Sequence, residues 1–404
     1  MINTLREVKI VMQKKLGFGF MRLPVLNPDD MTSIDIEQVK KMADYFIGHG
    51  FTYFDTAYMY HDYKSEEALR RAVVERYPRD AFTAATKMPL ALMKSADEHA
   101  KIFENQKKNV GVDFFDYYLL HNMTLEQYER AKKWGTVDYL KAKRDAEEIR
   151  KLGFSCHDTA ENLAKILDDC PGFDFVQLQI NYLDWENAGV QSGACYKAAE
   201  EHGLKVTVME PVKGGTLAKI PEDAEKLLRS IHPDWEPAHW AIKFVASLPD
   251  VQTVLSGMST FEQLKSNVDA MTDFTPFTGE ERDAVMKAGE IIRKWYAIPC
   301  TGCRYCVETN HCPRNIPIPN YFALYNAAKQ REPESIPGGF MIERLYYGNL
   351  VNDGYGKASA CVKCRKCEKV CPQHIKIADF LADAADFLEI DMAGALEALH
   401  KKPE

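Results

Sequence analysis

Three strand-like runs in the N-terminal part of the chain each lead into polar side chains that could transfer or polarise a proton. These side chains are Asp55 and Tyr60 after residues 51–54, Lys87 after residues 81–86, and His121 after residues 114–120. A tyrosine has a pKa of about 10 and donates a proton slowly at neutral pH unless a nearby cation lowers that pKa. Because parallel strands of a barrel end at one mouth, we expect these groups to share a pocket.

Eight of the eleven cysteines form two clusters near the C-terminal end of the chain. They are spaced Cys300-x2-Cys303-x2-Cys306-x5-Cys312-Pro and Cys361-x2-Cys364-x2-Cys367-x3-Cys371-Pro. The second spacing resembles the bacterial ferredoxin motif, in which three close thiolates bind one 4Fe-4S cluster and the fourth binds the other. By that rule one cluster takes Cys300, Cys303, Cys306 and Cys371, and the second takes Cys361, Cys364, Cys367 and Cys312.

Zinc is the alternative occupant of these cysteines, since four thiolates also suit that ion. Zinc sites usually use two separated pairs of cysteines, whereas both motifs here begin with a triplet at three-residue spacing. The pattern therefore favours two 4Fe-4S clusters. The other three cysteines, Cys156, Cys170 and Cys195, have no mutual spacing, and we interpret Cys170 and Cys195 as packing residues.

The elements that must position these groups follow from apolar runs of strand length that alternate with amphipathic helical stretches. A (β/α)8 barrel takes about 250 residues, so a chain of 404 has room for a second domain. We predict an α/β fold with a TIM barrel over residues 1–295. A smaller, mainly helical ferredoxin-like dicluster domain with C-terminal helices is predicted over 296–404. The expected strands are 17–21, 51–54, 81–86, 114–120, 152–155, 175–179, 205–209 and 251–255.

Helices are expected between these strands and after the last one. Their predicted ranges are 35–49, 65–76, 96–111, a helix ending at 150, 279–296, 320–330 and a helix over 380–388. Between His121 and Val137 we predict a long loop that carries Tyr128 and Trp134. Such a loop either shapes the pocket or is a solvated insertion whose aromatic rings cover apolar surface.

Composition narrows the class of partner. The net charge of −8 argues against nucleic acid, because phosphate binding requires a basic surface. The charged first residues lead into no long apolar stretch, so we expect neither a signal peptide nor a membrane span. With cysteines clustered for metal binding and no export signal, a cytoplasmic location is expected.

The motifs Asp55-Thr-Ala-x-x-Tyr60, Thr86-Lys87 and Leu119-Leu-His121, in this order on successive strands, resemble the aldo-keto reductase family. The resemblance covers roughly residues 8 to 275. It implies hydride transfer between NADPH or NADH and a small carbonyl or alcohol substrate. It also implies that Tyr60 is the general acid, that Lys87, held by Asp55, lowers the pKa of Tyr60, and that His121 orients the carbonyl.

The resemblance also implies a nucleotide site along the later strands. It places the nicotinamide carboxamide on Ser155 and Gln177, a pyrophosphate on the loop Glu210, Pro211, Val212, Lys213, Gly214 and Gly215, and the adenosine phosphate near Gly257 and Asn267. The chain departs from many relatives, which have Asn at the position of Cys156 and an aromatic residue, stacked on the nicotinamide, at that of Met209. Relatives selective for NADPH often have Lys, Ser and Arg where this chain has Gly257, Met258 and Gln263. The sequence therefore offers no clear cation for a 2′-phosphate, and NADPH, NADH and a flavin stay open.

Three functions fit these patterns. In the first, an oxidoreductase uses NAD(P)H at Tyr60 while the clusters are structural or regulatory. In the second, the clusters relay electrons between a ferredoxin- or flavodoxin-like carrier and a flavin or substrate in the barrel. The third is a non-catalytic, nucleotide-binding redox sensor. Because a pure binding protein needs no complete set of four proton-handling groups, the first is favoured over the third.

Overall fold

The structure is a computed structural model of the 404-residue chain. The part of the chain that it describes comprises residues 14–27, 30–188, 190–293, 297–298, 300, 305–308, 312–329, 342–369, 371 and 375–389. Cys303 and the predicted domain boundary between residues 295 and 296 lie outside these ranges.

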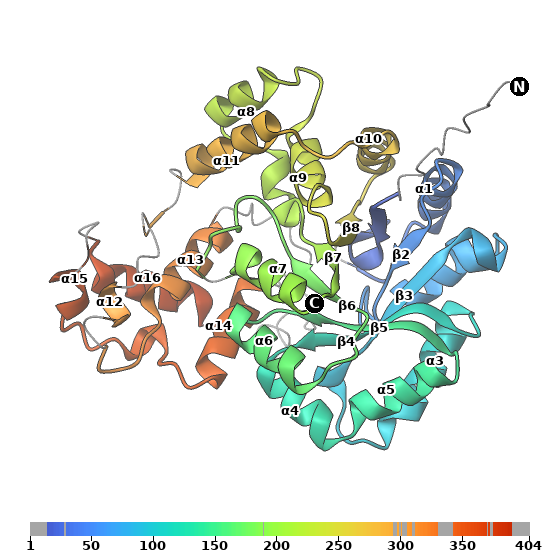
Figure 1. The fold of residues 1–404 in the computed structure, drawn as a ribbon, viewed down its shortest axis with the longest axis horizontal. Helices are drawn as coiled ribbons and strands as arrows, with labels where there is room; N and C mark the ends of the chain where they lie inside the picture. Colours follow the sequence, from blue (N-terminus) through green and yellow to red (C-terminus); the bar gives the residue numbers. More distant parts are fainter. Residues whose placement is uncertain are drawn as a thin grey trace, which may run out of the picture.

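Eight parallel strands close into a barrel in sequence order, which confirms the predicted fold (Figure 1). The strands are β1 (Leu16–Gly19), β2 (Tyr53–Asp55), β3 (Thr83–Met88), β4 (Phe115–Met123), β5 (Ile149–Cys156), β6 (Phe175–Gln179), β7 (Lys205–Met209) and β8 (Val251–Gly257). The helices of this half are α1 (Ile36–Gly48), α2 (Ser65–Leu69), α3 (Glu98–Val110), α4 (Leu125–Lys133), α5 (Thr136–Asp145), α6 (Ala160–Asp169), α7 (Ser192–Glu201), α8 (Glu222–Arg229), α9 (Pro237–Ala246), α10 (Phe261–Thr272) and α11 (Gly279–Arg293).

A layer of mainly apolar side chains lies inside the barrel. Tyr53, Ala85 and Leu255 are buried there against Tyr117. Because side chains alternate between the two faces of a strand, residues two and four positions further along these strands also point inward. This alternation carries Asp55, Lys87 and His121 to the inside of the barrel, above the apolar layer, at the carboxyl ends of the strands.

Local sequence signals explain where the barrel helices begin and end. The Asp35 carboxylate accepts a 3.0 Å hydrogen bond from the backbone N–H of Gln38 and so caps the start of α1. The predicted helix over 35–49 is confirmed to within one residue at each end, and Gly50 follows it with a φ of +82°, a conformation that favours glycine.

The segment between His121 and Val137 is not the long loop that the sequence predicted. Strand β4 continues to Met123, and α4 follows after Thr124, whose hydroxyl caps it by accepting from the backbone N–H of Gln127. Tyr128 is buried in the main core and Trp134 packs against it. The predicted helix ending at 150 is also wrong at its end, because α5 ends at Asp145 and β5 begins at Ile149.

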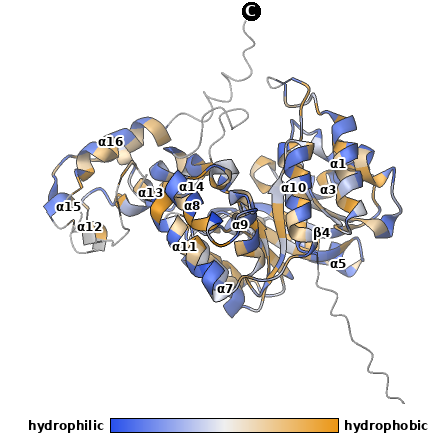
Figure 2. Ribbon diagram, turned by 90° about the horizontal axis from the view of Figure 1, so that it is seen from above, coloured by the Kyte–Doolittle hydropathy of each residue, from blue (hydrophilic) through white to orange (hydrophobic). Residues whose placement is uncertain are grey.

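The C-terminal part has a hydrophobic core of its own, distinct from the barrel core. Its helices are α12 (Tyr305–Glu308), α13 (Ile318–Lys329), α14 (Ile342–Asn352), α15 (Lys366–Lys369) and α16 (Ile377–Leu388). They lie to one side of the barrel, at the left in Figure 1, and α13 and α16 carry many hydrophobic residues (Figure 2). We call this group of helices the cysteine domain.

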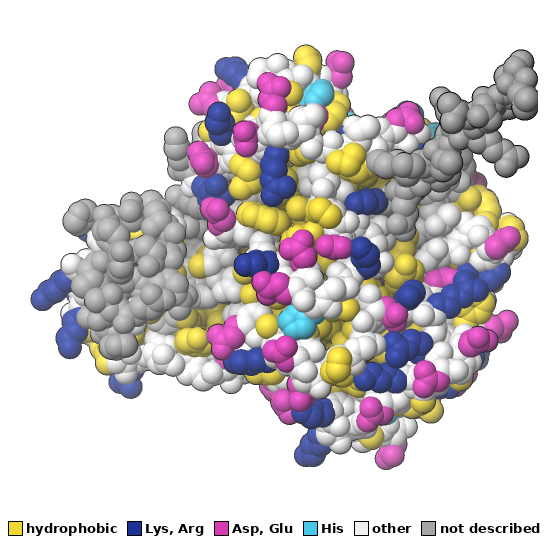
Figure 3. All heavy atoms as spheres, in the orientation of Figure 1, with side chains coloured by type: hydrophobic (Ala, Val, Ile, Leu, Met, Phe, Trp, Pro, Cys, Tyr) yellow, Lys and Arg dark blue, Asp and Glu magenta, His cyan; other side chains and the backbone are white. Residues whose placement is uncertain are grey.

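The surface and the helix lengths add two observations. Acidic and basic side chains are interspersed over the barrel face drawn in Figure 3. Of the helices in the described ranges, none combines the length and the apolar character needed to cross a bilayer.

Candidate active site

A buried ion pair lies at the mouth of the barrel. The Lys87 ammonium is 2.6 Å from Asp55 Oδ1 and 2.7 Å from the carbonyl oxygen of Thr56, and its side chain is fully buried. Burial lowers the pKa of Lys87, but the Asp55 carboxylate and Tyr60 outweigh it, so the net shift is upward. Lys87 is therefore a permanent cation at neutral pH.

Tyr60 lies over this cation. The Lys87 ammonium is 5.2 Å from the centroid of the Tyr60 ring, and the Tyr60 ring meets the His121 ring edge-on with centroids 5.8 Å apart. Burial raises the pKa of Tyr60, and Lys87 acts against that rise. The predicted effect of Lys87 on the Tyr60 pKa thus has the expected sign, but burial gives the larger contribution in the structure.

His121 is a neutral imidazole in this environment. Burial lowers the pKa of His121 well below its usual range, and the positive charge of Lys87 and the neighbouring His157 lower it further. A neutral imidazole carries one N–H and can donate one hydrogen bond from the ring without adding a charge to the pocket.

Several buried polar atoms near the mouth have no hydrogen-bond partner among the described residues. They are Asp55 Oδ2, His121 Nδ1, Asn122 Oδ1 and Gln177 Oε1. A buried polar group without a partner costs about 1–3 kcal/mol, so atoms of this kind gathered at strand ends fit a site that a polar ligand completes.

Asn122 is a site residue that the sequence analysis missed. Asn122 has a φ of +58° and lies where the register between β4 and β5 shifts. Its backbone N–H donates a 2.8 Å hydrogen bond to Ser155 Oγ. Its position directly after His121 was the available signal, but the irregularity that turns it toward Ser155 depends on strand pairing.

Of the nucleotide-site positions that the resemblance marks on β5 to β7, Ser155, Gln177 and Met209 lie together and Cys156 does not. Ser155 and Gln177 are partners in the register between β5 and β6, and Gln177 Nε2 lies 3.4 Å from the sulfur of Met209 on β7. Cys156 lies on the other face of β5, buried in the outer core, where nearby Cys195 adds to the effect of burial in raising the pKa of its thiol. It therefore points away from the site.

A second buried ion pair holds the loop that follows β7. Lys213 Nζ lies 2.6 and 2.7 Å from the two carboxylate oxygens of Asp184, and both side chains are buried. Positive φ values at Glu210, Lys213 and the two glycines curl the backbone of this loop. Pro211 is buried and Val212 packs against the core. Such a curled backbone can direct several N–H groups toward an anion.

The structure supplies a cation that the sequence analysis missed. Arg22, which follows β1, forms a 3.4 Å ion pair with Glu210 and lies beside Gly257, where an added Cβ would be 3.2 Å from Arg22 Cδ. Gln263 accepts from the backbone N–H of Ser259 at the start of α10, and Asn267 Nδ2 donates to Ser256 Oγ. Arg22, from the N-terminal end of the barrel sequence, therefore lies beside the residues that are predicted to bind the adenosine phosphate.

Of the seven motif cysteines in the described ranges, six gather on one core. Cys306 and Cys367 are buried in the core of the cysteine domain, and α12 and α15, which carry them, are in contact. Cys300, Cys312, Cys361 and Cys371 pack against the same core, whereas Cys364 is exposed. Within the described ranges, no three His, Cys, Asp or Glu side chains converge closely enough to bind one metal ion, and Cys303 lies outside these ranges.

Two residues of the second motif turn the backbone sharply. Lys363 and Arg365, each between two motif cysteines, have φ values of +52° and +54°. Such left-handed residues turn the chain sharply, so the thiols of a closely spaced triplet can face a common centre.

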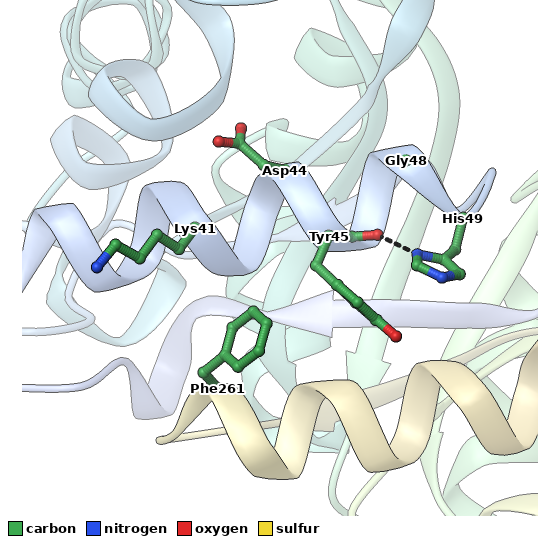
Figure 4. Close-up of a pocket in the computed structure, with 6 residues that line it drawn as sticks. All are labelled: Lys41, Asp44, Tyr45, Gly48, His49 and Phe261. Atoms are coloured by element: carbon green, nitrogen blue, oxygen red, sulfur yellow. Dashed lines mark hydrogen bonds between the residues drawn. The ribbon is translucent and has the colours of Figure 1, made fainter.

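A hollow of about 530 Å³ lies elsewhere, on the outside of the barrel between α1 and α10 (Figure 4). Its lining residues are Lys41, Asp44, Tyr45, Gly48, His49 and Phe261. No residue of the predicted site belongs to it, so it has no part in the chemistry at the barrel mouth.

Two family models match the chain and divide it between them. Residues 15–290 match the aldo/keto reductase family, and residues 299–375 match a 4Fe-4S dicluster domain. Among curated proteins, an uncharacterized oxidoreductase of Bacillus subtilis, YqkF, is 24% identical over 298 residues, which are 64% of this chain and 90% of that protein. An aldo-keto reductase of Mycolicibacterium vanbaalenii is 26% identical over 54% of this chain and 73% of its own.

Solved structures show the same barrel. The holo form of the aldo-keto reductase AKR11C1 from Bacillus halodurans is 25% identical with a TM-score of 0.55, covering 68% of this chain and 91% of its own. An aldo-keto reductase from Klebsiella pneumoniae in complex with NADPH is 21% identical with a TM-score of 0.54, over 68% and 90% of the two chains.

Proposed function

The chain belongs to the aldo/keto reductase family as an NAD(P)-dependent oxidoreductase with a 4Fe-4S domain, and we propose that it reduces a small carbonyl compound with NADPH. The observation that carries this proposal is the buried contact between Lys87 and Asp55 at 2.6 Å, with Tyr60 directly over the ammonium. This arrangement places a phenol beside a fixed cation at the end of the barrel where a substrate can enter.

Each side chain at the mouth has a separate role in this reduction. A bound NADPH supplies a hydride to the carbonyl carbon. Tyr60 donates its hydroxyl proton to the carbonyl oxygen, and Lys87 stabilises the phenolate that this step leaves behind. Asp55 keeps Lys87 charged and in place, while the neutral His121 donates a hydrogen bond that orients the carbonyl oxygen.

The nucleotide site that we propose runs from β5 around the mouth to α10. The unpaired Gln177 Oε1 and the neighbouring Ser155 suit the nicotinamide carboxamide, and the curled loop Glu210–Gly215 suits the pyrophosphate. NADPH is favoured over NADH because Arg22 adds a cation for phosphate beside Gly257. The Klebsiella pneumoniae relatives are described in complex with NADPH and with NADP.

For the cysteine domain we propose two 4Fe-4S clusters, with Cys300, Cys303, Cys306 and Cys371 on one and Cys361, Cys364, Cys367 and Cys312 on the other. The gathering of described motif cysteines on one core supports this assignment. We place the domain boundary at 295/296. A ferredoxin- or flavodoxin-like carrier could exchange electrons with these clusters, which is the alternative route that the test below separates from hydride transfer.

Isotope transfer tests the proposed reaction directly. The purified enzyme is incubated anaerobically with an aldehyde and with NADPH deuterated at the reactive C4 position, and the alcohol is analysed by mass spectrometry. Direct transfer predicts one deuterium in each product molecule. An alcohol that carries only solvent hydrogen would contradict the proposal and favour electron transfer through a flavin or the clusters.

A further inference from the structure

One helix of the cysteine domain reaches into the mouth of the barrel. The hydroxyl of Tyr346 on α14 lies 3.0 Å from Nδ1 of His157 and 3.3 Å from Oε1 of Gln179. Tyr346 itself is buried, so this is an internal contact between the two domains. Tyr346 and His157 belong to none of the motifs that the sequence analysis identified.

The two barrel partners of Tyr346 lie next to the proposed active site. His157 follows the end of β5, two residues after Ser155, and Gln179 is the last residue of β6, on the same inward face as Gln177. His157 is close enough to His121 to affect its pKa. As a whole residue, His157 is half-buried.

The position of α14 is fixed from both sides. Asn349 Nδ2, one turn after Tyr346, donates a 3.1 Å hydrogen bond to the carbonyl oxygen of His157. The adjacent Tyr347 faces the other way, and its hydroxyl accepts a 2.8 Å hydrogen bond from the backbone N–H of Ala358, three residues before Cys361. Successive residues of one helix thus contact the barrel mouth and the segment that leads into the second cysteine motif.

The hydrogen-bond directions follow from the surrounding donors. Gln179 Nε2 donates to Asp184, so Gln179 Oε1 is an acceptor and takes the single hydroxyl proton of Tyr346. His157 Nδ1 must then donate to the Tyr346 oxygen, which leaves Nε2 of His157 as a bare acceptor. Burial lowers the pKa of His157 to about 4, so the ring is uncharged at neutral pH.

We propose that His157, held in this tautomer by Tyr346, recognises a neutral hydrogen-bond donor on the carbonyl substrate, such as a hydroxyl group distant from the carbonyl. Substrate specificity is then shared by the two domains, with Tyr346 as a positioning residue. An uncharged acceptor favours a hydroxyl over a methyl group, which donates no hydrogen bond, and over a carboxylate, which has no proton to donate. This inference rests on the proposed carbonyl reduction.

Three aldehydes of equal chain length, ending in a hydroxyl, a methyl or a carboxylate group, test the inference. Wild type should have a kcat/KM about tenfold higher for the hydroxyl compound than for the methyl compound, which is the size of one good hydrogen bond. In Tyr346→Phe the ratio of kcat/KM for the hydroxyl compound to that for the methyl compound should fall close to one, because the KM for the hydroxyl compound rises. The kcat and the affinity for NADPH, measured by fluorescence, should stay unchanged.

The matched control is Tyr321→Phe, which removes a buried hydroxyl of the same domain that donates to the carbonyl oxygen of Gly356. It should keep the wild-type preference. His157→Phe removes the barrel partner of the same contact. This variant should therefore lose the preference for the hydroxyl compound even if Tyr346→Phe folds poorly. A wild-type enzyme without preference for the hydroxyl compound, or a Tyr346→Phe variant that retains it, overturns the inference while the reductase function stands. If wild type reduces none of the three, the proposed function fails, and the inference with it.

Discussion

Burial and charge act on the pKa of Tyr60 in opposite directions, and their balance sets how the residue works. Burial raises the pKa and Lys87 lowers it, so at neutral pH the phenol keeps its proton and has a cation ready for the phenolate that forms. The same burial makes His121 neutral, so it can donate a hydrogen bond without competing with Lys87 for Asp55.

The neutral His157 gives a pH prediction. Because its folded pKa lies below the unfolded value of about 6.5, the unfolded chain binds more protons at pH 5, and stability falls as the pH drops below 6.5. His157→Gln cannot bind that proton, so its loss of stability between pH 7 and pH 5 should be smaller than that of wild type. The free energy of unfolding in urea at the two pH values measures this difference.

His202 provides a control of opposite sign. Its backbone partner Ala198 and the Asp168 carboxylate raise the pKa of His202, so its contribution is complete below the unfolded pKa and is lost as the pH rises. His202→Gln should therefore lose more stability than wild type between pH 7 and pH 5. Equal acid sensitivity of wild type and His157→Gln would contradict the assignment of His157 as a neutral ring.

At the scale of elements, the loop after β7 depends on the buried pair of Lys213 and Asp184. A buried ion that loses its partner destabilises a protein by about 3–5 kcal/mol. Asp184→Asn keeps the shape of the side chain but leaves Lys213 unpaired. It should lower the free energy of unfolding by about that amount and weaken NADPH binding, since the loop carries the proposed pyrophosphate site.

Glu222→Gln is the matched control for this prediction. Glu222 pairs with Lys226 one turn later on the exposed face of α8, where such pairs contribute about 0.5 kcal/mol or less. Urea unfolding should find little change in this variant. A small effect of Asp184→Asn, similar to that of Glu222→Gln, would show that the loop does not depend on the buried pair.

The sequence predicted elements best where one signal acts locally. Strand-length apolar runs that end near Asp55, Lys87 and His121 placed three strands of the barrel, because a run of this kind is a local signal. The prediction failed at α4, where charged residues obscured the helical spacing of the buried Tyr128 and Ala131. Arg22 was missed for another reason, because its place beside Gly257 arises only when β1 pairs with β8 to close the barrel.

At the scale of the molecule, the two domains contact each other through hydrogen bonds between polar side chains and backbone. Asn320 Nδ2 donates to the carbonyl oxygen of Ala188, and Asn162 Nδ2 lies 3.2 Å from an Asp353 oxygen. Cysteine spacing predicted the second domain, but it holds no information on where that domain meets the barrel. The role of Tyr346 therefore emerged only from the structure.

The cluster assignment predicts the metal content of a cysteine variant. Cys361→Ser removes one ligand of the second proposed cluster, so anaerobically purified protein should contain about half the iron and sulfide of wild type. Cys195→Ser, which changes a buried barrel cysteine outside both motifs, should keep the full content. Unchanged iron in Cys361→Ser, or zinc in the wild-type protein, would contradict two 4Fe-4S clusters with these ligands.

The most direct test of the account is the turnover of Tyr60→Phe with NADPH and an aldehyde, compared with Tyr58→Phe, which removes a half-buried hydroxyl two residues away. General acid catalysis contributes about 10²–10⁴-fold, so Tyr60→Phe should lose about a thousandfold in kcat/KM while its dissociation constant for NADPH stays at the wild-type value. Tyr58→Phe should retain activity. Wild-type turnover in Tyr60→Phe would contradict the proposed role of Tyr60 as proton donor.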